Sequence, residues 1–212
     1  MESTPRTTVR RLADRGRYDT ATVHAILDAA PACTVAFVEE GAPVAIPTIH
    51  ARLDEVLYLH GSPASRLLTV AASGEELCVA ATLIDGIVVA RSAFNSSLNY
   101  RSVVLFGRGR LVTDLDEKLA AMRAVTEHIL PGRWDELRAP TSKEIAGTAI
   151  VAMPIEEASA KVRSGPPKDD EGDAAIWSGV IPLRTVPGEP LPERDLPTPE
   201  SVAAFVRSAP SA

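Results

Sequence analysis

The chain has 212 residues, a formal net charge of −6 and a sequence pI of about 5.3, so we expect no nucleic-acid surface. Hydrophobic residues make up 45% of it and charged residues 24%, a balance typical of one globular domain with a sizeable core. No apolar run reaches the roughly 18 residues that span a membrane, and the N-terminus lacks a secretory signal, which predicts a soluble, cytoplasmic protein without a membrane partner.

The chain begins with a charged arm, residues 1–19, followed by a short helix that Asp19 or Thr20 caps and Pro31 ends. Apolar runs then predict three strands, at 33–38, 43–51 and 56–60. Pro47 cannot donate a hydrogen bond to a neighbouring strand, so it indicates an edge, a bulge or an opening. Another helix follows, in which Ser62 suits the N-cap and Gly74 the end.

Two hairpins and the longest helix are expected in the middle of the chain. The dipeptide Asp85-Gly86 favours a hairpin turn, here between strands at 76–84 and 87–93. A long strand at 100–112 contains Gly107 and Gly109, which indicate a bend or a bulge. The remaining elements are a helix at 114–129, capped by Thr113 and carrying an apolar stripe, and a hairpin between 147–155 and 158–163.

The C-terminal part contains a polar linker at 164–173, an apolar patch at 176–184 and a helix near 199–207. We therefore expect three regions: an N-terminal arm at 1–19, a domain at 20–184 and a Pro-rich tail at 185–212. Short, hairpin-connected strands with a few helices between them predict an α+β, mainly β fold, built as a small antiparallel barrel with peripheral helices.

The start of the second helix, residues 60–66, is the best physical case for anion binding. A helix N-terminus presents N–H groups and a positive dipole end, and Gly61 permits close approach of the backbone. Ser65 and Arg66 add a hydroxyl and a guanidinium. The alternative is an ordinary surface helix with a solvated arginine.

Other candidate side chains are ambiguous by themselves. His60 ends a strand, where a histidine is either a hydrogen-bonded structural group or a donor, general acid or axial ligand facing a cofactor. Tyr100 and Arg101 follow a polar loop and alternate in direction, so only one of them can face a given site. Trp177 suits either a hydrophobic anchor of the tail or a cofactor contact.

The sequence gives no support for a disulfide, a metal site or the common nucleotide-binding and hydrolase motifs. Cys33 and Cys78 lie inside apolar runs, which favours two buried free thiols over a disulfide or a metal pair. No group of His, Cys or carboxylate residues has metal-ligand spacing, so no metal site is expected. Nucleotide-binding glycine loops and the GxSxG motif are absent as well.

The chain resembles the flavin-nucleotide-binding branch of the pyridoxamine 5′-phosphate oxidase-like superfamily, which includes the nitroimidazole-resistance proteins. The resemblance rests on the order and spacing of three segments, 44–68, 77–107 and 176–183, together with the helix after the second. It implies a split β-barrel that forms a homodimer and binds flavin mononucleotide (FMN) at the subunit interface.

The resemblance also implies roles for particular residues. Thr48 and Ile49 would run beside the flavin ring, and His60, Gly61, Ser65 and Arg66 would lie at the flavin phosphate. Tyr100, Arg101 and Ser102 would border the flavin or its phosphate, and Trp177 would approach the ring.

The chain departs from the oxidases of this superfamily. It has one arginine where they use a basic pair at the phosphate helix, and it lacks their C-terminal basic-aromatic signature, which argues against pyridoxamine phosphate oxidation. The leading hypothesis is an FMN-dependent oxidoreductase acting on a small molecule, with His60 as proton donor. The alternatives are a haem-binding split-barrel protein with His60 as ligand and a flavin-binding module without turnover.

Overall fold

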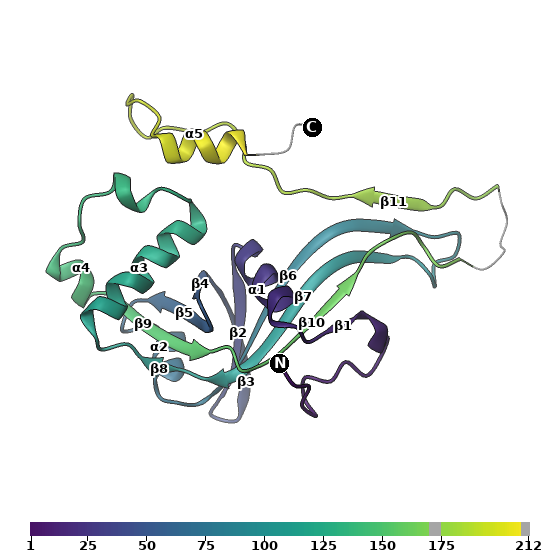
Figure 1. Cartoon of the computed structure of the whole chain (residues 1–212), viewed down its shortest axis with the longest axis horizontal. Helices are drawn as coiled ribbons and strands as arrows, with labels where there is room; N and C mark the ends of the chain where they lie inside the picture. The colour runs from purple at the N-terminus through teal and green to yellow at the C-terminus, as the bar shows by residue number, and fades with distance from the viewer. Residues whose placement is uncertain (170–174, 209–212) are drawn as a thin grey trace. The chain divides into compact units, whose positions relative to one another are not determined.

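In a computed structural model, residues 1–169 and 175–208 of the chain are described, and Figure 1 shows their elements. The α-helices are α1 (Thr20–Ala29), α2 (Arg66–Ala72), α3 (Leu115–Ile129), α4 (Ser142–Ala146) and α5 (Glu200–Arg207). The strands are β1 (Gly16–Arg17), β2 (Cys33–Glu39), β3 (Ala42–Thr48), β4 (His50–Leu53), β5 (Val56–Gly61), β6 (Glu76–Val89), β7 (Ser97–Arg108), β8 (Arg110–Leu111), β9 (Ala149–Pro154), β10 (Glu157–Arg163) and β11 (Gly179–Pro182). Two short 3₁₀ turns are η1 (Ala13–Arg15) and η2 (Trp134–Glu136).

The predicted α+β, mainly β class is confirmed, because antiparallel strands dominate and the helices lie around them. The chain divides into two compact units, and the long strands β6 and β7 each run from one into the other. The first unit comprises 1–30, 80–105 and 157–185, and the second comprises 31–79, 106–156 and 186–212. None of the described helices is both long and apolar enough to cross a membrane.

The first unit is built on the strand order β1-β10-β7-β6, with β11 paired to β6. Helix α1 packs against β10 and buries an apolar face formed by Val23, Ile26 and Leu27. The Asp19 carboxylate accepts a hydrogen bond from the Thr22 N–H at 2.8 Å, so the predicted cap is confirmed.

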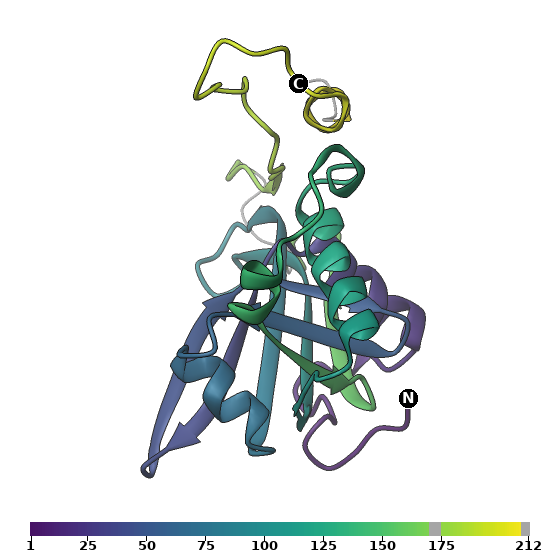
Figure 2. The same cartoon turned by 90° about the vertical axis from the view of Figure 1, so that its left-hand side faces the viewer.

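The second unit contains the β2–β3 hairpin and a separate sheet of order β4-β5-β9-β8. Helix α3 packs across β4 and β5, while α2 packs against β5, β8 and β9 (Figure 2). Successive side chains of a strand point to opposite faces of its sheet. His60 accordingly lines a cavity with α3, whereas Gly61 meets Leu68 of α2.

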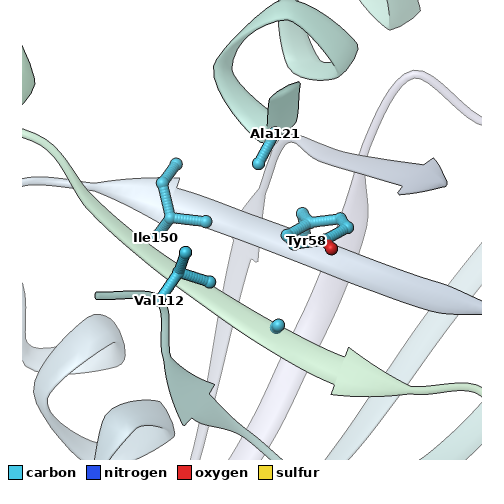
Figure 3. Close-up of a cluster of buried hydrophobic side chains, with 5 residues drawn as sticks. Tyr58, Val112, Ala121 and Ile150 are labelled. Atoms are coloured by element: carbon cyan, nitrogen blue, oxygen red, sulfur yellow. The ribbon is translucent and has the colours of Figure 1, made fainter. Parts of the chain in front are cut away.

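A buried cluster joins the sheet of the second unit to α3. Tyr58, Val112 and Ile150 come from the sheet side and Ala121 from the helix (Figure 3), and Ala152 of β9 completes the cluster. The Tyr58 hydroxyl donates to a Glu117 carboxylate oxygen at 3.0 Å, and Arg110 donates to the same carboxylate at 2.6 and 3.0 Å. Burial, helped by the bond to Glu117, raises the pKa of Tyr58 to about 12, so its phenol stays protonated and keeps donating.

The expected hairpin turn at Asp85-Gly86 is wrong. Both residues lie inside the continuous strand β6, and the turn falls between the end of β6 and the start of β7. Gly86 lies opposite Pro182 of β11, where a Cβ would come within 3.0 Å of the Ile181 carbonyl oxygen. The glycine therefore serves close approach of β11 rather than a turn.

The other apolar run predictions need smaller corrections. The run at 43–51 divides at Ile49 into β3, which pairs with β2, and β4, which pairs with β5. The predicted edge at Pro47 is confirmed, because β3 is the last strand in its order. The expected final hairpin is wrong, since β9 pairs with β5 and β8 whereas β10 pairs with β1 and β7.

The N-caps of α2 and α3 lie at other residues than the sequence predicts. Helix α2 begins at Arg66 with Ser65 before it, and Ser62 instead accepts a hydrogen bond from the Ala64 N–H. Helix α3 is capped by Asp114, whose carboxylate accepts from the Glu117 N–H at 2.8 Å, rather than by Thr113. A carboxylate also suits the positive end of the helix dipole better than a hydroxyl.

The C-terminal predictions have mixed outcomes. The apolar patch at 176–184 forms β11, and the expected last helix is confirmed as α5. The predicted linker at 164–173 falls partly on residues outside those described. The division into an arm, a domain and a tail at residues 19 and 184 stays a prediction. Neither Cys33 nor Cys78 forms a disulfide among the described residues. Cys33 is buried, which raises the pKa of its thiol to about 12, whereas Cys78 is only partly buried.

Gly109 separates β7 from β8 and confirms the predicted irregularity. A Cβ at this position would lie 2.5 Å from both the Ala71 carbonyl oxygen and Val151 Cγ1.

Gly109→Ala should therefore push α2 from the sheet and lower the free energy of unfolding by about 1–3 kcal/mol, measured by urea denaturation. The control is Gly188→Ala, where a Cβ meets nothing within 4 Å and the change should stay within about 0.5 kcal/mol. Equal stabilities of the two variants would contradict the close approach.

Candidate functional site

A cavity of about 380 Å³ lies in the second unit between the sheet and α3. Its walls are mostly apolar, with one imidazole, one guanidinium and one indole among them. The lining residues are His60, Met122, Val125, Thr126, Ile129, Leu130, Arg133, Trp134, Thr148 and Ile150. A concave, mainly apolar site with few polar groups is the usual form of a small-molecule or cofactor pocket.

Local sequence patterns explain how these walls form. His60 and Ile150 are partners in the β5–β9 register, so they lie side by side on the face toward α3. Met122, Val125 and Ile129 belong to the apolar stripe predicted for the long helix. Val125 is buried, but Ile129 is 46% exposed, so the end of the stripe lines the cavity instead of filling the core.

His60 is the one titratable ring that lines the cavity. It is half-buried, and its Nδ1 atom is buried without a hydrogen-bond partner among the described residues. Burial lowers the pKa of His60 below its usual 6.5, so the ring is neutral at pH 7. A neutral imidazole keeps a lone pair available to accept a proton or to bind a metal ion.

The segment after α3 forms the polar side of the cavity. Arg133 forms an ion pair with Glu136 at 3.0 Å, and the backbone N–H of Trp134 donates a hydrogen bond to the Glu127 carboxylate at 2.8 Å. Glu136 also accepts two hydrogen bonds from Ser201, at the start of α5. These Ser201 bonds, followed by Arg133, lower the pKa of Glu136, so its carboxylate stays charged and holds the segment in place.

Arg133 and Trp134 were not expected from the sequence. Both follow Pro131-Gly132, which ends α3, and a segment after such a stop reads as an ordinary loop. Their placement depends on the turn that folds η2 back beside α3, which is a tertiary contact. The only sequence signal is the apolar stripe of α3, which extends to Ile129 at the end of the helix.

The residues expected at a flavin phosphate are divided by the sheet. His60 faces α3, whereas Gly61 faces α2, where a Cβ would lie 3.2 Å from Leu68 Cδ2. Ser65 precedes α2, and the Arg66 guanidinium binds the Glu39 carboxylate in an exposed ion pair. Thr48 ends β3, and Ile49 follows it as the single residue between β3 and β4.

The remaining expected site residues belong to the first unit. Arg101 donates two hydrogen bonds to the Asp85 carboxylate, at 2.8 and 3.0 Å, which holds the guanidinium in one orientation. The Ser102 hydroxyl donates to the Lys161 carbonyl at 3.3 Å, and Tyr100, directly before Arg101, is half-buried. Trp177 is 64% exposed, and its ring lies against Gly179.

A metal site built from side chains alone finds no support among the residues that the structure describes. Within those residues, no cluster of three or more His, Cys, Asp or Glu could hold a metal ion. The rings of His50, on β4, and His128, on α3, have centroids 4.8 Å apart. His50 is fully buried. A metal at the His60 cavity would therefore have to arrive with ligands of its own.

Comparison with known proteins gives a consistent result. A family model described as pyridoxamine 5′-phosphate oxidase matches residues 19–162. The flavocytochrome Anf3 from Azotobacter vinelandii is 42% identical, with a TM-score of 0.87, over 97% of this chain and 99% of that one. A FAD and haem binding protein from Mycobacterium smegmatis is 40% identical, with a TM-score of 0.86, over 90% of this chain and 97% of that one.

A more distant structure shares the fold alone. It is a candidate 5-nitroimidazole antibiotic resistance protein from Bacteroides thetaiotaomicron, 20% identical with a TM-score of 0.58, over 69% of this chain and 86% of that one. A search of curated proteins gave no match.

The lowered pKa of His60 predicts a pH dependence. An unfolded chain binds a proton at the ordinary histidine pKa of 6.5, whereas the folded chain resists protonation. The free energy of unfolding should therefore fall as the pH drops below about 6.5 toward the lowered pKa, and this part of the slope should vanish in His60→Ala. Ring-proton NMR, with His60→Ala for assignment, should give His60 a midpoint below 6.5. A midpoint at or above 6.5 would show that the ring is solvated.

Proposed function

The chain belongs to the pyridoxamine 5′-phosphate oxidase-like split-barrel superfamily, and we propose that it is a redox protein that binds both a flavin and a haem. The proposal is supported by two relatives at 40% and 42% identity, one described as a flavocytochrome and the other as a FAD and haem binding protein. A flavin supplies hydride and single-electron chemistry, and a haem supplies single-electron and oxygen chemistry.

The observation that carries the haem part is the His60 cavity. A histidine nitrogen is a common protein ligand of haem iron, and only the neutral ring can bind a metal. Burial holds the His60 ring neutral, and its Nδ1 atom is a buried polar group without a partner among the described residues. Since such a group costs free energy, a bond made to Nδ1 itself would relieve a cost present in the free protein.

The remaining walls of the cavity suit a haem as well. Ile150 and Val125 offer apolar contact to a macrocycle, and Trp134 offers an aromatic ring. Arg133 is half-buried at the cavity, where it could bind a haem carboxylate in addition to Glu136. His60 would bind and orient the group, while the apolar walls would exclude water from it.

The flavin part keeps the contact residues that the family resemblance implies. Ser65 and Arg66 are proposed to hold a flavin phosphate, with Thr48 and Ile49 beside the ring. For Arg66 this requires that the phosphate share or replace its exposed partner Glu39. Tyr100, Arg101, Ser102 and Trp177 stay proposed flavin contacts, and the homodimer with a flavin at its interface stays part of the proposal.

The nature of the flavin and the reaction are also proposals. One relative is described as binding FAD, which favours FAD over the FMN expected from the sequence. We infer an oxidoreductase that moves electrons between a small molecule and the haem through the flavin. His60 is then an iron ligand rather than the proton donor first considered, because its ring nitrogen is buried and its pKa lowered.

The haem part is tested by His60→Ala. Titration of the purified protein with haemin should give a Soret band for the wild type, and His60→Ala should lose it or bind at least about tenfold more weakly, as expected on removing an iron ligand. His24→Ala is the matched control, because His24 lies on α1 of the first unit, and should behave as the wild type. An unchanged Soret band in His60→Ala would remove His60 from the haem site.

The flavin part is tested by Arg66→Ala. Losing a charge-assisted hydrogen bond to phosphate should weaken FAD binding by about 1.5–3 kcal/mol, measured by quenching of flavin fluorescence. Arg123→Ala is the control, because Arg123 is an exposed arginine of α3 paired with Asp135. A protein that binds no flavin would overturn the flavin proposal, and equal affinities of the two variants would take Arg66 out of the phosphate site.

A further inference from the structure

A second, smaller cavity lies in the first unit, beside the end of β10. Its volume is about 150 Å³. Strand β1 pairs antiparallel with β10, Gly16 opposite Lys161, and this register brings η1 beside the last residues of β10 (Figure 1). The cavity is thus lined by Asp14, Arg15 and Arg17 on one side and by residues from 162 to 168 on the other.

The side chains around this cavity are strongly basic. Arg15, Arg17, Arg163 and Lys168 line it, against the single carboxylate of Asp14. Such an excess of cations is unexpected in a chain whose net charge is −6. Like charges held at one cavity repel one another, and a bound anion would remove that repulsion.

Arg163 makes the strongest case, because it is buried. It is only 7% exposed, and its Nη1 atom donates to the Asn99 side-chain oxygen and, at 3.5 Å, to the Leu98 carbonyl. Both acceptors are neutral, and no described carboxylate forms an ion pair with this guanidinium. A buried charge without a counter-charge is costly, which is consistent with the lowering of the Arg163 pKa by burial and by Arg15.

The cavity is also held in shape by hydrogen bonds. Asn99 uses its oxygen for Arg163 and donates its amide N–H to the Gly165 carbonyl at 3.1 Å. Gly165 has φ +95°, a conformation that favours glycine, so the chain turns sharply just after β10. On the opposite side, Arg17 donates to the Asp14 and Gly16 carbonyls at 2.8 and 2.7 Å.

The acidic residue nearest along the chain does not neutralise the site in the described part of the structure. Asp169 follows Lys168 directly, but its carboxylate accepts a hydrogen bond from the Arg91 backbone N–H at 3.0 Å. It is not among the residues around the cavity. Among the described residues, the guanidinium of Arg163 therefore has the neutral partners Asn99 and Leu98 and no carboxylate.

We propose that this cavity, between η1 and the end of β10, is a binding site for a phosphate or pyrophosphate group. Planar guanidinium groups match phosphate oxygens in pairs, and the cavity holds three arginines and a lysine. Its 150 Å³ corresponds to about five water molecules at ~30 Å³ each, which is room for a phosphate group but not for a large organic ligand. Its lining shares no residue with that of the His60 cavity, and the proposal does not depend on haem binding.

The test measures pyrophosphate binding to the full-length chain by calorimetry at low salt, because exposed charges are screened as salt rises. The double variant Arg15→Gln, Arg17→Gln should bind pyrophosphate about ten- to a hundredfold more weakly, as two charge-assisted hydrogen bonds are lost. The matched control is Arg10→Gln, Arg11→Gln, which removes the same charge from exposed residues of the same arm and should bind within about twofold of the wild type. Equal affinities in both double variants, or no binding to the wild type, would overturn the proposal.

A second variant, on β10, tests the site without any change in the N-terminal arm. Arg163→Met removes the buried charge and also the donor to the Asn99 side-chain oxygen, so its own melting temperature without ligand is the baseline for this variant. Pyrophosphate should raise the melting temperature of the wild type and leave that of Arg163→Met unchanged. A pyrophosphate-induced rise in Arg163→Met as large as in the wild type would contradict the proposed site.

Two sources of the phosphate group are distinguished by parallel titrations with FAD and riboflavin, which lacks phosphate. If the group belongs to a flavin nucleotide, the Arg15, Arg17 double variant weakens FAD binding and leaves riboflavin binding unchanged. If it belongs to another phosphate compound, that variant weakens pyrophosphate binding only. His60→Ala should bind pyrophosphate as the wild type does, so the haem proposal and this one can fail separately.

Discussion

Side chains alternate between the two faces of a strand, and in β5 this alternation decides what the second unit can bind. Tyr58 and His60 point toward α3, while Gly61 points toward Leu68 of α2. The α2 face is packed too closely to admit a Cβ at Gly109, whereas the α3 face contains the cavity. The histidine therefore meets an apolar cavity, and its ring stays neutral.

The two cavities illustrate opposite responses of titratable groups to burial. His60 can lose its proton, so burial produces a neutral ring with a free lone pair. Arg163 keeps its proton at any physiological pH, so burial leaves a charge that favours an anionic partner. The first environment suits a metal-bearing apolar group, and the second suits a phosphate.

Local signals predicted most elements of the fold. The cap at Asp19, the strand at 56–60 and the long helix depend on residues close together in the chain, and the structure contains all three. The turn predicted at Asp85-Gly86 is wrong because its signal is local. Strand β6 instead continues through these residues and pairs with β11, which is far along the chain. Likewise, β9 and β10 are adjacent in sequence but pair with different strands.

By itself, the sequence determined the class of fold, the superfamily and His60 as a residue of interest, because these follow from periodicity, segment order and residue type. Only the tertiary structure decided which helix His60 faces, that Arg133 and Trp134 join it, and that Arg163 is buried without an acidic partner among the described residues. Those facts arise when segments distant in sequence, such as α3 with β5 or η1 with β10, come into contact. Such contacts depend on packing and strand register, which local residue patterns do not encode.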